Sequence, residues 1–141
     1  MSSLNFLDVN VWLALSWRRH THTQRALKWF QDAAAEQFFL CRFTELTLLR
    51  LLTTDKILGE DAHTMKSAWN VLDQIQADER VSFLPEPDGI EREFRRLSNL
   101  SSRSPKVWAD AYLLAFASTA GLKLVTFDRA LQTKGVDVLV L

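Results

Sequence analysis

Hydrophobic and polar positions divide the chain into short apolar runs and longer amphipathic segments, which alternate along the sequence. The short runs predict β-strands at residues 4–7, 38–41, 81–84, 122–126 and 136–141. Apolar positions three and four residues apart predict helices at residues 10–16, 24–35, 44–52, 61–77, 89–100 and 107–120. A further short helix is expected between the last two strands. We expect Thr44 to cap its helix and Gly121 to end the last long one. This alternation indicates an α/β fold with a largely parallel sheet.

Composition favours one packed domain that spans residues 1–141. The chain has 141 residues, 48% of them hydrophobic, with only 3 Pro and 4 Gly. Cys41 is the single cysteine, so no internal disulfide or cysteine-based zinc site can form, which fits a reducing cytoplasm. We expect neither a signal peptide nor a membrane span, and therefore a cytoplasmic protein. With 17 basic and 17 acidic residues, a polyanionic partner must be held by a local basic patch.

Four acidic residues interrupt or follow apolar segments. Asp8 lies in "NFLDVNVWLAL" and Asp128 in "VTFDRAL", each where a predicted strand ends. Glu45 heads the helix "TELTLLRLL", just after another strand. Asp110 lies in "VWADAYLLAFA", where the neighbouring positions are apolar or aromatic. Taken alone, each has an ordinary structural explanation: Asp8 and Asp128 could cap helices, Glu45 could complement a helix dipole, and Asp110 could pair with an arginine.

Together these acids indicate a different role. Parallel strands bring their carboxyl ends to one edge of the sheet, which is where ligands bind in open α/β folds. Two unit charges 4 Å apart repel by about 4 kcal/mol at an effective dielectric near 20. A divalent cation would neutralise such a cluster, and oxygen-only ligation is what Mg²⁺ or Mn²⁺ prefers. Such a metal can activate water and stabilise a phosphodiester undergoing displacement. Asp8 is therefore interpreted as a metal ligand.

The sequence resembles the PIN-domain ribonucleases, specifically the VapC-type toxins of bacterial toxin–antitoxin pairs. The matching stretches are "FLDVNVWLAL", "CRFTELTLLRLLT", "WADAYLLAFASTAGLKLVTFD" and the closing "VDVLVL". The resemblance implies a three-layer sandwich with a mostly parallel sheet of four or five strands, and a Mg²⁺-dependent endoribonuclease in which Mn²⁺ can substitute. It implies an acidic quartet that binds the metal: Asp8, Glu45, Asp110 and Asp128. Asp8 and Asp110 would be direct ligands, and Glu45 and Asp128 could act partly through water. Asn10 and Thr126 match positions that orient ligands or substrate.

Basic residues offer candidate RNA contacts. Arg18 and Arg19, followed by His20 and His22, could contact a phosphate backbone, although a solvated surface loop is the default interpretation. The two histidines lack a third metal ligand nearby, and we discount a metal site there. A second cluster comprises Arg92, Arg95, Arg96, Arg103 and Lys106. The tryptophans Trp29, Trp69 and Trp108 lie on apolar helical faces and are assigned to core or dimer packing.

Other functions remain open at this point. A haloacid-dehalogenase-like phosphatase would need an acid at Asn10, and a phospho-receiver domain would need paired acids after its first strand. A PIN-like RNA-processing nuclease outside any toxin–antitoxin pair, or a binding module with relic acids, is also possible. By resemblance we expect a small antitoxin partner, with an extended segment across the helix at residues 61–77. This segment would insert an Arg or Lys among the four acids. We also expect a homodimer.

Overall fold

The computed structural model describes residues 3–133 and 135–141, and in this part of the chain five parallel strands form one sheet in the order β3-β2-β1-β4-β5. The strands are β1 (Leu4–Leu7), β2 (Gln37–Leu40), β3 (Val81–Phe83), β4 (Lys123–Thr126) and β5 (Val138–Val140). The helices are α1 (Val9–Ser16), α2 (Thr23–Asp32), α3 (Arg42–Leu52), α4 (Asp55–Leu58), α5 (Met65–Ala77), α6 (Ile90–Ser98) and α7 (Lys106–Ala120). Two short 3-10 turns are η1 (Gly59–Asp61) and η2 (Arg129–Leu131).

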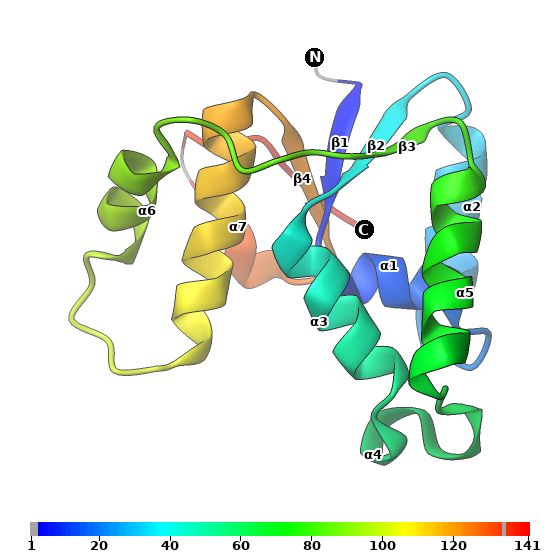
Figure 1. The fold of residues 1–141 in the computed structure, drawn as a ribbon. Helices are drawn as coiled ribbons and strands as arrows, with labels where there is room; N and C mark the ends of the chain where they lie inside the picture. The colour runs from blue at the N-terminus through cyan, green and yellow to red at the C-terminus, as the bar shows by residue number, and fades with distance from the viewer. Residues whose placement is uncertain (1–2, 134) are drawn as a thin grey trace.

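Helices cover both faces of the sheet, as the three-layer prediction required (Figure 1). Along each strand alternate side chains point to opposite faces. Phe6 pairs in register with Phe39 and Leu124, and these three pack with α6 and α7. Leu7 pairs in register with Val125, and both belong to the second core, which packs against α1, α2, α3 and α5. Because both faces are buried, the strands are nearly continuous hydrophobic runs in sequence.

Several predicted helix boundaries are corrected by the structure. Thr44 does not cap α3: Cys41 occupies that position, and the Thr44 hydroxyl accepts a hydrogen bond from the Cys41 N–H at 2.9 Å. The helix predicted at residues 61–77 begins at Met65, because the Thr64 hydroxyl accepts from the Ser67 N–H and caps it. The segment before it holds α4 and η1, which were not predicted. Gly121 ends α7 as expected, with a φ of 70°.

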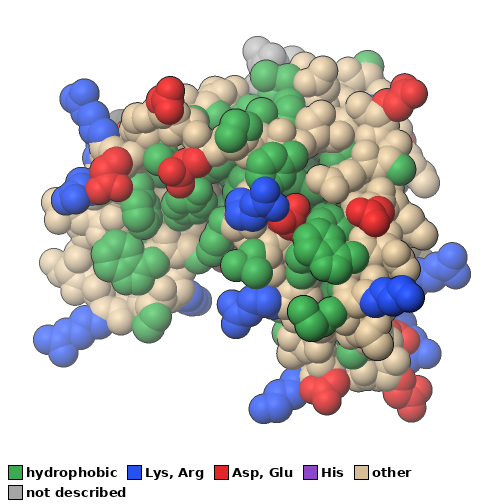
Figure 2. All heavy atoms as spheres, viewed as in Figure 1, with side chains coloured by type: hydrophobic (Ala, Val, Ile, Leu, Met, Phe, Trp, Pro, Cys, Tyr) green, Lys and Arg blue, Asp and Glu red, His purple; other side chains and the backbone are tan. Residues whose placement is uncertain are grey.

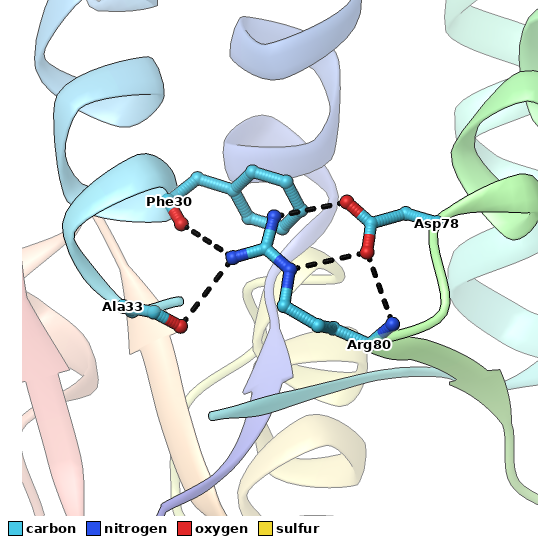
Figure 3. Close-up of polar contacts among 4 residues, drawn as sticks. All are labelled: Phe30, Ala33, Asp78 and Arg80. Carbon is cyan, nitrogen blue, oxygen red and sulfur yellow. Dashed lines mark hydrogen bonds and ion pairs between the residues drawn. The ribbon is translucent and has the colours of Figure 1, made fainter. Parts of the chain in front are cut away.

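Arg80, just before β3, forms hydrogen bonds with the end of α2 (Figure 3). Its guanidinium donates to both carboxylate oxygens of Asp78, at 3.1 and 2.9 Å, and to the carbonyls of Phe30 and Ala33 at 2.8 and 3.4 Å. It also lies 4.1 Å from the centre of the Phe30 ring. These contacts satisfy carbonyls at the end of α2 and fix the edge of the sheet.

None of the helices in the described residues combines the length and the apolar character that crossing a membrane requires.

Candidate active site

Asp8 and Asp128 lie where the order of the strands reverses. From β1 the chain adds β2 and β3 on one side, then returns to add β4 and β5 on the other side of β1. The carboxyl ends of β1 and β4 therefore flank the switch point, where ligands bind in open α/β sheets. Asp8 follows β1 directly, and Asp128 follows β4 after one intervening residue. The Asp8 N–H donates to the Val125 carbonyl at 2.9 Å, which holds the two strand ends together.

Three hydrogen bonds fix the Asp8 carboxylate and its surroundings. The Val9 N–H donates to Oδ1 at 2.7 Å, so Asp8 also caps α1, and the buried Thr126 hydroxyl donates to Oδ2 at 2.8 Å. The Thr126 oxygen in turn accepts from the Asp128 N–H at 3.0 Å. Burial raises the pKa of Asp8, the Thr126 and Val9 hydrogen bonds oppose that rise, and the charges of Asp110 and Asp128 add to it. A cation at this point would relieve the repulsion.

Asp110 approaches the same edge from the first turns of α7. It is half-buried, and burial followed by the charge of Asp128 raises the pKa of its carboxyl, while Lys106 one turn earlier opposes the rise. Among the described residues, no hydrogen bond or ion pair holds this carboxylate, so it is not a structural partner of an arginine. Asp128 is exposed, and its Oδ1 accepts from the Ala130 N–H at 2.9 Å, which caps η2. The structure therefore brings Asp8, Asp110 and Asp128 into one electrostatic group.

Glu45 stands apart from this group. Its side chain is 9% exposed and forms an ion pair with Arg42 one turn earlier on α3, and the Arg42 guanidinium lies 4.7 Å from the centre of the Phe83 ring. The pKa of Asp8 responds to Asp110 and Asp128, and Glu45 is not among the charges that shift it. In this structure Glu45 is thus paired with Arg42, and its place in the predicted quartet stays a prediction.

A pocket of about 380 Å³ opens beside Asp8. Its lining includes the predicted polar residues Asp8, Asn10, Thr126 and Asp128. His20, Thr21, His22 and Phe127 also line it. His20 and His22 were considered in the sequence as metal ligands, which was discounted, and as part of a basic segment that could contact phosphate, but not as aromatic rings that line the pocket of Asp8. The sequence "HTH" lies close to Asp8 in the chain and could have suggested that these histidines are near the site. Their contacts with Phe127, however, join segments far apart in the chain, which the sequence pattern does not predict.

The predicted RNA-contacting residues Arg18, Arg19, Arg103 and Lys106 are exposed. Arg18 and Arg19 precede His20, and Arg19 pairs with Asp61 at 3.4 Å. Lys106 begins α7 one turn before Asp110, and Arg103 lines a separate hollow beside Trp108. Figure 2 shows the surface hollowed between the lobe of α6 and α7 and the lobe of α3 and α4, with Lys and Arg side chains on both sides.

The donor set fits a hydrated divalent cation. The group supplies carboxylate oxygens, and each oxygen of Asp8 that accepts one hydrogen bond keeps a second lone pair. In the part of the chain that the structure describes, no group of three or more His, Cys, Asp or Glu side chains could hold a metal ion on its own, so the candidate ligands are the pair Asp8 and Asp110 together with water. Mg²⁺ keeps several waters and binds proteins through one or two carboxylates, so an open arrangement of Asp8 and Asp110 suits it.

Comparisons with known proteins identify relatives of the chain. The family model of the PIN domain matches residues 6–136. The chain is 39% identical to ribonuclease VapC41 of Mycobacterium tuberculosis over 91% of both proteins. It is 31% identical to ribonuclease VapC38 of the same organism, over 90% of this chain and 86% of the relative.

Two solved structures share the fold. One is the VapBC2 complex from Rickettsia felis bound to a DNA fragment from its promoter, with a TM-score of 0.70 at 10% identity over 97% of this chain and 98% of that one. The other is Mycobacterium tuberculosis VapC20, described as a toxin that cleaves the sarcin-ricin loop, with a TM-score of 0.61 at 14% identity over 85% and 86% of the two chains. At these identities the likeness concerns the fold alone.

Proposed function

The chain belongs to the PIN domain family and, within it, to the VapC ribonucleases, and from this premise we propose that it is a metal-dependent endoribonuclease that acts as the toxin of a toxin–antitoxin pair. One observation carries the proposal: Asp8, Asp110 and Asp128 lie near the switch point of the sheet, where burial and the charges of Asp110 and Asp128 raise the pKa of Asp8, and burial and the charge of Asp128 raise the pKa of Asp110. Such a group has an unfavourable energy unless a cation joins it.

Asp8 and Asp110 are the residues that would hold Mg²⁺ or Mn²⁺, with Asp128 acting directly or through water. When bound, the ion supplies charge neutralisation at the phosphodiester and makes water a better nucleophile at neutral pH. The chain's own part is to orient the carboxylates. Thr126 and the Val9 N–H hold the plane of Asp8, and Thr126 also accepts from the backbone N–H of Asp128. Asn10 is exposed in the same pocket, where its amide can donate to substrate oxygens.

A groove next to the acids supports the antitoxin part of the proposal. Residues from α1, α2 and α5, together with Asp78, line a hollow of about 280 Å³. Trp12 belongs to this mostly apolar lining, which favours an apolar segment of a partner.

Helix α1 connects this groove to the acids. α1 begins at Asp8 and has 8 residues, so its last turn lies about 12 Å from the acids at 1.5 Å per residue. An extended antitoxin segment in the groove could therefore deliver an Arg or Lys to Asp8 and Asp110, displacing the cation.

The opposite side of α5 suits a second copy of the chain. Between α3 and α5 lies a hollow of about 260 Å³ whose lining includes Leu46, Met65 and Trp69, which are 55%, 78% and 48% exposed. Figure 2 shows hydrophobic side chains gathered over α3 in this view. Because this face and the Trp12 groove lie on different sides of α5, a homodimer and an antitoxin can be bound together.

The proposed function is tested by cleavage of total RNA and by growth. We expect the purified protein to cleave RNA with Mg²⁺ or Mn²⁺, to lose that activity in excess chelator, and to regain it on metal addition. Its expression should arrest growth, and co-expression of the small protein encoded beside it should restore growth. Full activity in chelator overturns the metal-dependent nuclease. Cleavage without growth arrest favours a PIN-like RNA-processing nuclease instead.

A further inference from the structure

Part of the wall of the pocket beside Asp8 is made of aromatic rings that the proposed cation chemistry does not use. His22 and Phe127 have ring centroids 4.6 Å apart with an interplanar angle of 33°, and His20 lies 6.0 Å from Phe127 at 27°. All three are half-buried and line the pocket that contains Asp8 and Asp128. Rings that serve only the core would be closed off from this pocket.

Hydrogen bonds hold these rings in place. The His22 N–H donates to Nδ1 of His20 at 3.0 Å, and the His20 N–H donates to the Trp17 carbonyl at 3.1 Å. The Thr23 hydroxyl donates to the Ala14 carbonyl at 2.6 Å, which anchors the loop to the end of α1. On the other side, Phe127 is fixed between Thr126 and Asp128, whose hydrogen bonds also orient Asp8. These hydrogen bonds therefore fix the positions of the three rings relative to Asp8 and Asp128.

An acidic pocket needs a means of holding RNA that does not depend on attracting phosphate. Stacking of an unpaired base on an aromatic side chain is such a means, because every base has a π-face and stacking tolerates nearby negative charge. Metal ligation by the two histidines is the competing explanation. It is disfavoured because the third ring, which contacts both histidines, is a phenylalanine and cannot bind a metal.

We propose that His20, His22 and Phe127 form a base-stacking subsite, in which an unpaired base next to the scissile phosphate stacks on the wall and places that phosphate over Asp8 and Asp128. The inference rests on the proposed ribonuclease function and adds the residues that select an unpaired nucleotide at the point of cleavage. Double-stranded RNA, whose bases are already stacked and paired, should then be a poor ligand for this site.

The test uses a single-stranded oligoribonucleotide of random sequence with one 2-aminopurine, a base whose fluorescence falls when it stacks. Binding is measured with Mg²⁺ in an Asp110→Asn background, so that cleavage does not consume the probe. We expect fluorescence quenching on binding. His22→Ala should weaken affinity by about 5- to 150-fold and abolish the quenching, as loss of one stacking contact does. His22→Phe should restore both, because it keeps the ring without the imidazole nitrogens.

Controls separate stacking from other roles. His63→Ala removes the third histidine, which lies outside the pocket beside Ser67, and should change neither affinity nor quenching. If His22→Ala lowers the melting temperature, Phe127→Leu serves as a second variant. It removes the aromatic ring but keeps an apolar side chain, and it should weaken the fluorescence quenching. The subsite is wrong if the parent protein does not bind the probe, if His22→Ala leaves binding unchanged, or if His22→Phe is as defective as His22→Ala.

Failure of the subsite and failure of the proposed function give different results. Cleavage of total RNA by the otherwise unmodified protein and by His22→Ala is measured in parallel. Equal cleavage by both means that the subsite is wrong and the ribonuclease stands. No cleavage by the unmodified protein with Mg²⁺ or Mn²⁺ means that the ribonuclease proposal fails, and the subsite fails with it.

Discussion

At the scale of single residues, the site combines positions that sequence reasoning could place with contacts that it could not. Asp8 and Asp128 follow strands, and the rule that parallel strand ends meet was enough to bring them together. Arg42 stands three residues before Glu45 on a helix, so their ion pair was visible in the sequence as a helical spacing but was not considered. The contact of His22 with Phe127 depends on the path of a loop, which periodicity does not encode.

Asp110 gives the clearest prediction for one residue. Since burial and the charge of Asp128 raise the pKa of its carboxyl, its charged form is disfavoured in the folded protein. Asp110→Asn should therefore leave the melting temperature in chelator equal to or above that of the unmodified protein, while RNA cleavage is lost. A buried ion-pair partner would behave differently, because its removal costs about 3–5 kcal/mol. A large drop in melting temperature would make Asp110 a structural residue.

At the scale of elements, strands and long helices were predictable because burial on both faces of the sheet leaves a strong hydrophobic pattern. The first residues of the helices were less predictable from the sequence. Thr64 and Thr44 are both threonines near a predicted start, yet one caps a helix and the other lies inside the first turn and bonds back to Cys41. α4 has four residues, too few for a period to emerge. Periodicity thus places elements, while side-chain hydrogen bonds set their ends.

The Arg80 contacts predict how much one junction contributes to stability. Arg80→Ala removes two hydrogen bonds to Asp78 and the hydrogen bond to the Phe30 carbonyl, so we expect a loss of about 1–3 kcal/mol in urea unfolding. Arg95→Ala is the matched control. It breaks an exposed pair with Glu91 and should cost about 0.5 kcal/mol or less. Equal effects of the two substitutions would contradict this role for Arg80.

The same junction predicts a pH dependence. The hydrogen bonds from Arg80 hold the pKa of Asp78 below its ordinary value. A carboxyl whose pKa is lowered by folding stabilises the folded state above its unfolded pKa, and this contribution is lost as the pH falls through the lowered value. The stability difference between the unmodified protein and Asp78→Asn should therefore shrink on acidification below about pH 4, where the unfolded carboxyl takes up its proton. A difference that grows there would be inconsistent with the pair.

At the scale of the whole molecule, the two sides of α5 predict separable partners. Trp69→Lys places a charge on the α3–α5 face and should convert a dimer to a monomer in light scattering, without changing RNA cleavage per chain. Trp108→Lys changes a tryptophan of comparable exposure on α7, 61% against 48%, and should leave the dimer intact. If Trp69→Lys remains dimeric, the two copies meet elsewhere.

Antitoxin inhibition is also a property of the assembled molecule. An antitoxin peptide that inserts a basic side chain among Asp8, Asp110 and Asp128 should weaken Mn²⁺ binding, and replacing that basic residue by Ala should restore both metal binding and RNA cleavage. Unchanged Mn²⁺ affinity in the complex would mean that the antitoxin blocks RNA from a distance.

The central claim, that the acids at the switch point hold a cation required for RNA cleavage, is tested most directly by titrating Mn²⁺ while metal occupancy and cleavage rate are measured on the same sample. We expect the rate to rise in step with occupancy in the unmodified protein and in Asp73→Asn, which changes an exposed acid on α5. Asp8→Asn should lose both Mn²⁺ binding and cleavage. Full cleavage by Asp8→Asn, or cleavage by the unmodified protein with no Mn²⁺ bound, would contradict the account.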